Sequence, residues 1–434
     1  MTGAGSRGTV RGSGRLAELD LLRFVAALAV LSFHYFIAFA SVWGERPAKL
    51  FPAISTLSGL GILGVELFFM ISGFVILMSV WGRGLGAFAL SRLVRLFPAY
   101  WVSVAVTAAL YGLTGATALD PKLSPAEYGV NLTMLQRAFG VYDATGVYWS
   151  LWAELRFYVL ISILVIVGVT LNRCLVFMGV WLLAAGLLSG SDQAWVDLVV
   201  MPKYAPYFVG GMAFFLMTRF GPRLVLWCLA GISAGLAVSA AMERVAGRIG
   251  LVGYAAMPVP PWAVAATVIG FYVLMALVAL GLLRRLRWRG LVTLGALTYP
   301  LYLFHTAAAV LIVPALRDAL PPWLTALVTV AAAMAFSYLV YRVAERPVQE
   351  FVRARTRRSA PSPVPAPPPV PAAAQAFPAT SPVPATAPAF PAAPPVASAA
   401  PASPAVPPAP AFPPGPPPNS RPDPWATGEK ASLP

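Results

Sequence analysis

Apolar stretches of about 20 residues recur along most of this chain, and each could cross the hydrocarbon core of a bilayer as a helix. The pattern predicts ten such helices, at residues 19–43, 59–81, 98–115, 149–171, 174–190, 199–218, 223–242, 262–283, 291–315 and 322–343. The expected fold class is therefore all-α, a polytopic membrane protein with a bundle of about ten transmembrane helices around a polar cavity.

Composition and charge fit this expectation, because 59% of the residues are hydrophobic and only 11% are charged. The first apolar run is too long for a signal-peptide core, so the first helix is expected to stay in the membrane. One set of loops and termini contains 19 arginines, whereas the opposite set contains about eight basic residues, and such a bias marks the cytoplasmic side. Both termini are expected in the cytoplasm, and the net charge of +15 reflects topology rather than nucleic-acid binding.

Three regions differ in composition. Residues 1–18 are expected to form a short cytoplasmic segment, residues 19–351 the transmembrane domain, and residues 352–434 a cytoplasmic tail rich in Pro and Ala. After Arg358 lie 27 of the 43 prolines, a composition that predicts disorder with polyproline character. The tail could recruit a protein partner with a proline-binding groove, but a spacer is the preferred interpretation.

Only two histidines occur, His34 and His305, and each lies within an apolar run. His34 follows Arg23 on the first predicted helix with ten residues between them. Eleven helical steps return His34 to within roughly 20° of Arg23 and place it about 16 Å further along the axis. A fixed cation and a titratable base therefore lie on the same face of one helix. Such residues within a membrane span indicate a catalytic or binding site.

Other ionisable residues fall within the predicted spans. The helix directions place Glu66, Glu154 and His305, together with His34, in the outer half of the membrane. Arg23 lies near the inner edge, beside Asp20 on the same face, and the two could neutralise each other. Such residues also occur as simple contacts between helices, and the segment around His305 could be an aromatic packing face.

Two arginines, Arg92 and Arg95, lie three residues apart at the predicted inner surface. Their planar side chains suit phosphate, although arginines there can also anchor a helix to anionic headgroups. If these arginines bind phosphate, a phosphorylated ligand enters from the cytoplasmic side. The reaction centre is then expected nearer the outer face of the membrane. Glu345 is expected to pair locally at the end of the last helix, next to Arg346.

Six segments resemble motifs of the membrane acyltransferase 3 family of bacterial O-acyltransferases, in the order that the family shows. They are LDLLRFVAALAVLSFHYF, GVELFFMISGFVI, RLVRLFPAYW, YWSLWAELRFY, LTYPLYLFH and VAERPVQEF. The resemblance covers roughly residues 16–351. Arg23 and His34 match the family's Arg-x10-His signature, Arg92 and Arg95 match its Arg-x-x-Arg pair, and Glu66 stands where Asp is frequent.

The resemblance implies transfer of an acyl group, commonly acetyl, from cytoplasmic acyl-CoA to a hydroxyl of a carbohydrate or glycosylated product at the bacterial plasma membrane. Acyl-CoA is then a donor substrate rather than a bound cofactor, and no metal is required. His34 is expected to act as general base, with Glu154 or Glu66 accepting its second N–H and His305 as a further candidate. Arg92 and Arg95, with Arg23, would hold the CoA phosphates. An acyl-histidine intermediate stays open.

Two other functions also fit some of these features. A proton-coupled transporter or exporter of a small polar or glycosylated molecule would also bury charges among ten helices. It is disfavoured because the halves show no internal repeat and the polar residues form two groups at different depths. A scaffold that recruits partners through the proline-rich tail leaves the Arg-x10-His pair unexplained. The acceptor, which could be a surface polysaccharide, an envelope glycan or a secondary metabolite, and the acyl length are not determined by these patterns.

Overall fold

The computed structural model describes residues 16–114, 122–251, 259–283 and 289–358, and these contain helices and turns but no strand. The long helices are α1 (Ala17–Phe33), α5 (Gly64–Val80), α6 (Leu85–Thr114), α8 (Trp149–Val167), α9 (Leu171–Leu187), α10 (Ala205–Phe220), α11 (Leu224–Leu251), α12 (Pro261–Ala279), α13 (Arg289–Leu316) and α14 (Pro322–Val340). Short helices are α2 (Ala40–Trp43), α3 (Pro47–Leu50), α4 (Pro52–Gly59), α7 (Pro125–Asn131) and α15 (Arg346–Arg358).

The all-α membrane fold is confirmed. Nine helices of the described part are long and apolar enough to cross a membrane, and α9 is a shorter apolar helix at the position of the fifth predicted span. The residues up to Arg357 form one compact unit, so the chain is a multi-pass membrane protein. Segments 1–15, 284–288 and 359–434, which carry much of the predicted cytoplasmic charge and the proline-rich tail, lie outside the described residues.

Three predicted helix ends are wrong, and one of them is the end of the last helix, which continues from residue 343 to Thr356. The third predicted helix begins at Leu85 instead of residue 98, and Pro98 lies inside it. Proline usually begins a helix, but membrane helices tolerate it internally because neighbouring groups compensate for the lost hydrogen bond. Arg92 and Arg95 therefore lie on α6 itself rather than in a connection. Helix α11 likewise runs to Leu251 instead of residue 242, which brings Arg244 into the helix.

The described part of the chain contains three turns of π-helix. His34–Ala38 continues α1, Val196–Val200 lies between α9 and α10, and Tyr341–Glu345 joins α14 to α15. Such turns widen the helix and often occur at functional positions. The first begins at His34 and the third ends at Glu345. The second meets α8, where Arg156 Nη1 donates a hydrogen bond of 2.5 Å to the carbonyl oxygen of Asp197. All three turns thus lie at or beside ionisable residues.

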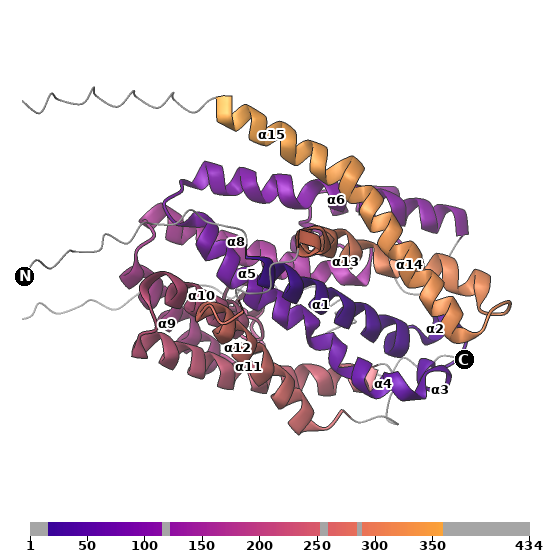
Figure 1. Cartoon of the computed structure of the whole chain (residues 1–434), viewed down its shortest axis with the longest axis horizontal. Coiled ribbons are helices and arrows are strands. Elements are labelled where there is room, and N and C mark those ends of the chain that lie inside the picture. The colour runs from indigo at the N-terminus through magenta and orange to yellow at the C-terminus, as the bar shows by residue number, and fades with distance from the viewer. Residues whose placement is uncertain (1–15, 115–121, 252–258, 284–288, 359–434) are drawn as a thin grey trace, which may run out of the picture. The chain divides into compact units, whose positions relative to one another are not determined.

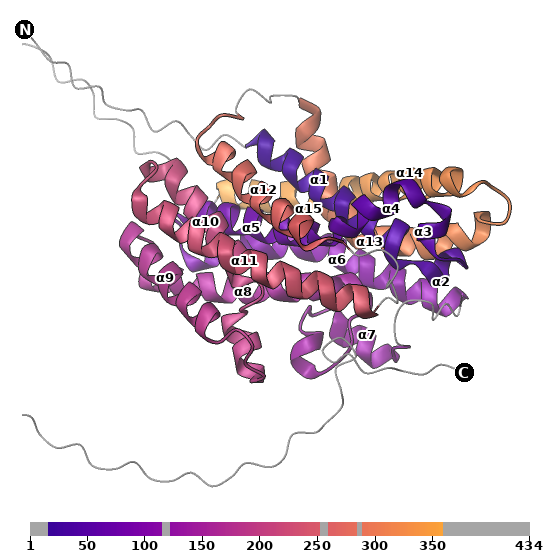
Figure 2. The ribbon, with the colours of Figure 1, turned by 90° about the horizontal axis from the view of Figure 1, so that it is seen from below.

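Helix α5 is central to the unit and packs against α1, α8 and α10, while α13 packs between α1 and α14. Figure 1 shows α9, α10, α11 and α12 grouped on one side of α5 and α1, with α14 on the other. The same grouping is visible when the molecule is turned, as in Figure 2. The three helices α1, α5 and α13 therefore carry their side chains into the middle of the bundle.

Glycine allows α5 and α10 to approach closely. A Cβ atom on Gly211 would lie 1.9 Å from the carbonyl oxygen of Met70, and one on Gly73 would lie 2.1 Å from that of Phe208. Backbone atoms cannot move aside as a flexible side chain can, so any larger residue forces the two helices apart. This contact uses the small-residue packing typical of membrane helices.

The substitution Gly211→Ala is expected to destabilise the protein by about 1–3 kcal/mol through this overpacking. A lower unfolding temperature of the detergent-purified protein is the measurement. Gly231→Ala on α11 is the matched control, because nothing lies within 4 Å of a Cβ at that glycine. Equal unfolding temperatures for the two variants would contradict the close packing.

Candidate functional site

The two histidines face each other in the middle of the bundle. His34 lies where α1 passes into the π-helical turn, and His305 lies on α13. The distance between His34 Nδ1 and His305 Nε2 is 3.3 Å. His305 is almost completely buried, with 1% exposure, whereas His34 is half-buried. The structure therefore joins two residues that are 271 positions apart in the sequence.

Their hydrogen bonds define one arrangement of protons. His305 Nδ1 lies 3.1 Å from the carbonyl oxygen of Leu301, and His34 Nδ1 lies 2.8 Å from that of Val30. Carbonyl oxygens only accept, so both Nδ1 atoms carry hydrogen. The single Nδ1–H of a neutral His34 is then shared between the carbonyl oxygen of Val30 and Nε2 of a neutral His305, and the lone pair of His34 is on its own Nε2. In this arrangement His34 can act as a base, and His305 fixes the orientation of its ring.

Contacts from several elements hold His305 in place. Tyr35 donates a hydrogen bond of 2.8 Å from its hydroxyl to the carbonyl oxygen of His305. The ring of Tyr302 lies 5.9 Å from the imidazole ring, measured between centroids, and its hydroxyl lies 2.7 Å from Ser150 Oγ. Thr306 contacts Thr145 at 3.3 Å between their hydroxyl oxygens. The π-helical turn and the loop before α8 both therefore brace the histidine.

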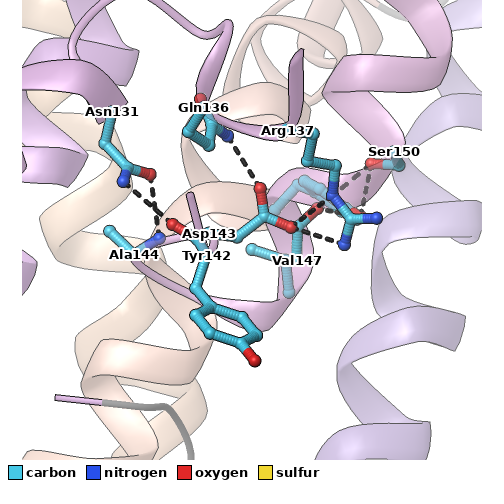
Figure 3. Close-up of polar contacts among 9 residues, drawn as sticks. Asn131, Gln136, Arg137, Tyr142, Asp143, Ala144, Val147 and Ser150 are labelled. Atoms are coloured by element: carbon cyan, nitrogen blue, oxygen red, sulfur yellow. Dashed lines mark hydrogen bonds and ion pairs between the residues drawn. The ribbon is translucent and has the colours of Figure 1, made fainter. Parts of the chain in front are cut away.

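That loop is itself held by buried polar contacts, which Figure 3 shows. Asp143 accepts hydrogen bonds of 2.7 Å from Gln136 Nε2 and from Arg137 Nε. The amide of Asn131 donates to the carbonyl oxygen of Tyr142 and accepts from the backbone N–H of Ala144. These contacts fix the backbone that leads to Thr145 and Ser150, whose hydroxyls contact Thr306 and Tyr302 on the histidine-bearing helix α13.

A second polar group lies around the arginines. Arg23 interacts electrostatically with Arg95, Asp20, Glu154 and Tyr158. Tyr158 also interacts with Arg92, so α1, α6 and α8 each supply charged or polar side chains to this arginine cluster, defined as Arg23, Arg92, Arg95, Glu154 and Tyr158. The structure thus brings together four residues that the sequence predicts for the site, and adds Tyr158. Glu154 lies with the arginines rather than in the outer group in which the sequence analysis expected it.

Glu154 is fixed inside this cluster. Its Oε1 accepts hydrogen bonds of 2.8 Å from Ser72 Oγ and 2.7 Å from the Tyr158 hydroxyl. By contrast, Arg92 Nε is buried without a hydrogen-bond partner, although Nη2 of the same guanidinium contacts Ser91 Oγ at 3.0 Å. One donor of the cluster is therefore available to a bound anion.

The expectation that Glu345 pairs locally is wrong. Arg346 instead forms an ion pair of 2.7 Å with Glu350, one helical turn further on. Glu345 is 4% exposed and interacts electrostatically with Arg95 on α6. It belongs with the arginine cluster because the π-helical turn packs against α6.

His305 Nε2 faces His34 Nδ1, and Glu66 and Glu154 each have another partner, so the role expected for the two carboxylates at His34 stays a prediction. Glu66 forms an ion pair of 3.0 Å with Nη1 of Arg244 on α11. Sequence reasoning missed Arg244, since the predicted helix ended two residues before it. A carboxylate buried in a membrane bundle is usually paired with a cation. Glu66 could therefore have prompted a search for a basic partner on another helix.

These features define a class: a multi-pass helical membrane protein whose bundle encloses an oriented pair of histidines and a separate cluster of arginines. The acyltransferase domain model of the acyltransferase 3 family matches residues 16–342. The chain belongs to this family and is a membrane acyltransferase. Neither the curated proteins nor the solved structures provide a match.

Proposed function

We propose that this acyltransferase moves an acyl group, most simply acetyl, from cytoplasmic acyl-CoA to a hydroxyl of a carbohydrate or glycosylated acceptor. The observation that carries the proposal is the His34–His305 pair, in which 3.3 Å separates the facing ring nitrogens. His34 can act as a neutral base, and it follows Arg23 along the same stretch of helix. Family membership favours this function over a transporter.

In the proposed reaction, His34 Nε2 takes the proton from the acceptor hydroxyl as that oxygen attacks the thioester carbonyl. The tetrahedral intermediate collapses, the carbon–sulfur bond breaks, and the CoA thiolate leaves. The imidazolium of His34 then gives its proton to the thiolate, so the free enzyme is regenerated. The carbonyl oxygen of Val30 and Nε2 of His305 share the Nδ1–H of His34 and so keep His34 in the productive tautomer.

The arginine cluster supports a donor site for CoA. Arg92 and Arg95 share one face of α6 at i, i+3, and arginine binds phosphate through paired hydrogen bonds. The levels of Arg23 and His34 differ by about 16 Å along α1, a separation that an extended pantetheine arm can bridge. The phosphates would stay at the arginines while the thioester reaches the histidine.

The proposal places the arginine cluster toward the cytoplasm in a bacterial plasma membrane, with both termini on that side. Helices α1, α6 and α13 contribute residues near their N-terminal ends to this region: Asp20 and Arg23, Arg92 and Arg95, and Gly295, whose Cβ position lies 2.5 Å from Asp20. The excess of arginines in the connections on the same side supports this orientation.

Membranes that contain the protein, incubated with acetyl-CoA labelled in the acetyl group and a cell-envelope glycan fraction, test the proposal. Free CoA thiol and hydroxylamine-labile labelled glycan are expected to form together in equal amounts. Membranes without the protein provide the background. A carrier would take up a solute without releasing thiol, and that outcome would reject acyl transfer.

Deletion of residues 359–434 is expected to leave the acyl-transfer rate within about twofold of the full chain, because every candidate site residue lies in the compact unit that ends at Arg357 and distant changes usually act independently. The rate per folded protein, measured with labelled acetyl-CoA, is the readout. Loss of transfer in the shortened chain would favour the scaffold hypothesis.

A further inference from the structure

The ion pair between Glu66 and Arg244 lies outside the histidine pair and the arginine cluster. The Glu66 side chain is 1% exposed and that of Arg244 is 15% exposed, with 3.0 Å between Oε1 and Nη1. The guanidinium also lies over the ring of Trp149, 4.3 Å from its centroid. Helices α5, α11 and α8 thus converge on one site, named here the Glu66 site and consisting of Glu66, Arg244, Trp149 and Tyr204.

The ion pair leaves hydrogen-bonding capacity unused. Glu66 Oε2 and Arg244 Nε are both buried and have no hydrogen-bond partner. An unsatisfied buried group costs about 1–3 kcal/mol, and more where it is charged. A structural ion pair would gain by satisfying these atoms. The site therefore offers one acceptor and one donor to a molecule that binds there.

Aromatic rings surround these two atoms. Trp149 lies 5.6 Å from Tyr204 and 6.0 Å from Phe69 between ring centroids, and Trp149 and Tyr204 are both half-buried. Half-buried aromatic faces beside a carboxylate and a guanidinium suit a sugar ring. The faces cover its apolar C–H groups, and the charged groups take its hydroxyls.

The Glu66 site adjoins the histidine pair through Tyr302. This tyrosine interacts electrostatically with Arg244 and Glu66, and its ring lies 5.9 Å from His305. Its hydroxyl bonds to Ser150 Oγ, one residue after Trp149. A molecule held at the Glu66 site thus lies next to Tyr302, which also neighbours the histidine pair.

The order of residues along two helices places this site on the side of the bundle away from the arginines. On α5 Glu66 precedes Ser72 by six residues, and on α8 Trp149 precedes Glu154 by five. Ser72 and Glu154 meet at the arginine cluster. Both helices therefore run from the Glu66 site toward the arginines over a rise of about 7–9 Å.

We propose that the Glu66 site is the acceptor subsite and binds an uncharged, polyhydroxylated sugar ring. Glu66 Oε2 accepts a hydrogen bond from one hydroxyl, Arg244 Nε donates to another, and Trp149 and Tyr204 border the sugar ring, so that a further hydroxyl reaches His34. The inference rests on the proposed function, because it takes His34 as the base to which the acceptor is presented.

The test compares wild-type protein with Glu66→Gln, Arg244→Gln and the double variant, with a cell-envelope glycan fraction from cells lacking this chain as the acceptor. The double variant is neutral and keeps a side-chain hydrogen bond, so it avoids an unpaired buried charge. The glycan concentration for half-maximal transfer is expected to rise about tenfold or more. The KM for acetyl-CoA should stay within about twofold, since the arginines lie elsewhere.

The matched control is Arg219→Lys, since Arg219 also lies over a tryptophan, 4.7 Å from the ring of Trp81, at an exposed position. It should leave both half-saturation values unchanged. If the double variant reaches half-maximal transfer at the same glycan concentration as wild type, the ion pair has only a structural role. That result would overturn the acceptor subsite but not the proposed function. Wild-type protein that transfers no label to glycan would overturn the proposed function itself, and the subsite with it.

Discussion

The substitution His34→Ala is expected to lower the rate of acyl transfer by about 10²–10⁴-fold, the contribution of a positioned general base. Without the imidazole, the acceptor hydroxyl must attack the thioester with its proton in place. The half-buried position of His34 and the retained fold predict little change in unfolding temperature. Formation of labelled ester from labelled acetyl-CoA, measured per folded protein, gives the rate.

Rescue by free imidazole provides the matched control for this variant. A small base that enters the space left at residue 34 is expected to restore part of the rate, whereas His305→Ala should be rescued poorly because His305 is 1% exposed. Transfer at the wild-type rate by His34→Ala would remove His34 from the mechanism.

The substitution Arg92→Ala is expected to raise the KM for acetyl-CoA by about 10–100-fold, since hydrogen bonds to charged groups contribute about 1.5–3 kcal/mol. The unpartnered Nε of Arg92 makes this guanidinium the donor best placed for phosphate. Arg92→Lys should recover only part of the loss, because lysine keeps the charge but not the planar pair of donors. Initial rates at varied acetyl-CoA concentration measure both changes.

Dephospho-CoA thioesters separate phosphate binding from a role in anchoring α6 at the lipid surface. If Arg92 binds phosphate, removing that phosphate from the donor weakens donor binding, and so does Arg92→Ala. When both changes are made, the loss of binding should be smaller than the sum of the two separate losses. An unchanged KM with a lowered unfolding temperature would assign Arg92 to membrane anchoring instead.

The periodicity of apolar residues was sufficient to predict the membrane class, because length and hydropathy alone decide whether a helix can span a bilayer. In the described part of the chain nine helices meet both criteria, against ten predicted, since α9 is shorter than a full span. Helix ends were less predictable. Pro98 suggested a start, yet α6 begins 13 residues earlier at Leu85. The π-helical turn at His34 carries no compositional signal, and it packs against the short helices α3 and α4, which follow it in the chain.

For the site, the sequence indicated the residues but not the partners. His34 and His305 are 271 positions apart, and no local pattern reports that α1 and α13 pack together. Arg244 and Tyr158 were missed for the same reason, as each meets residues on distant helices. Glu345 was assigned to Arg346 by adjacency, although neighbours at i, i+1 point to different faces of a helix. Its buried position against α6 became visible only in three dimensions.

Sealed proteoliposomes test the central claim most directly, with labelled acetyl-CoA outside and the glycan fraction trapped inside. A donor held at the arginine cluster and an acceptor held beyond the histidine pair predict labelled ester inside the vesicles and an equal amount of free CoA outside. Intact acetyl-CoA inside the vesicles, or ester only when donor and glycan share one side, would contradict transfer between two sites joined by His34.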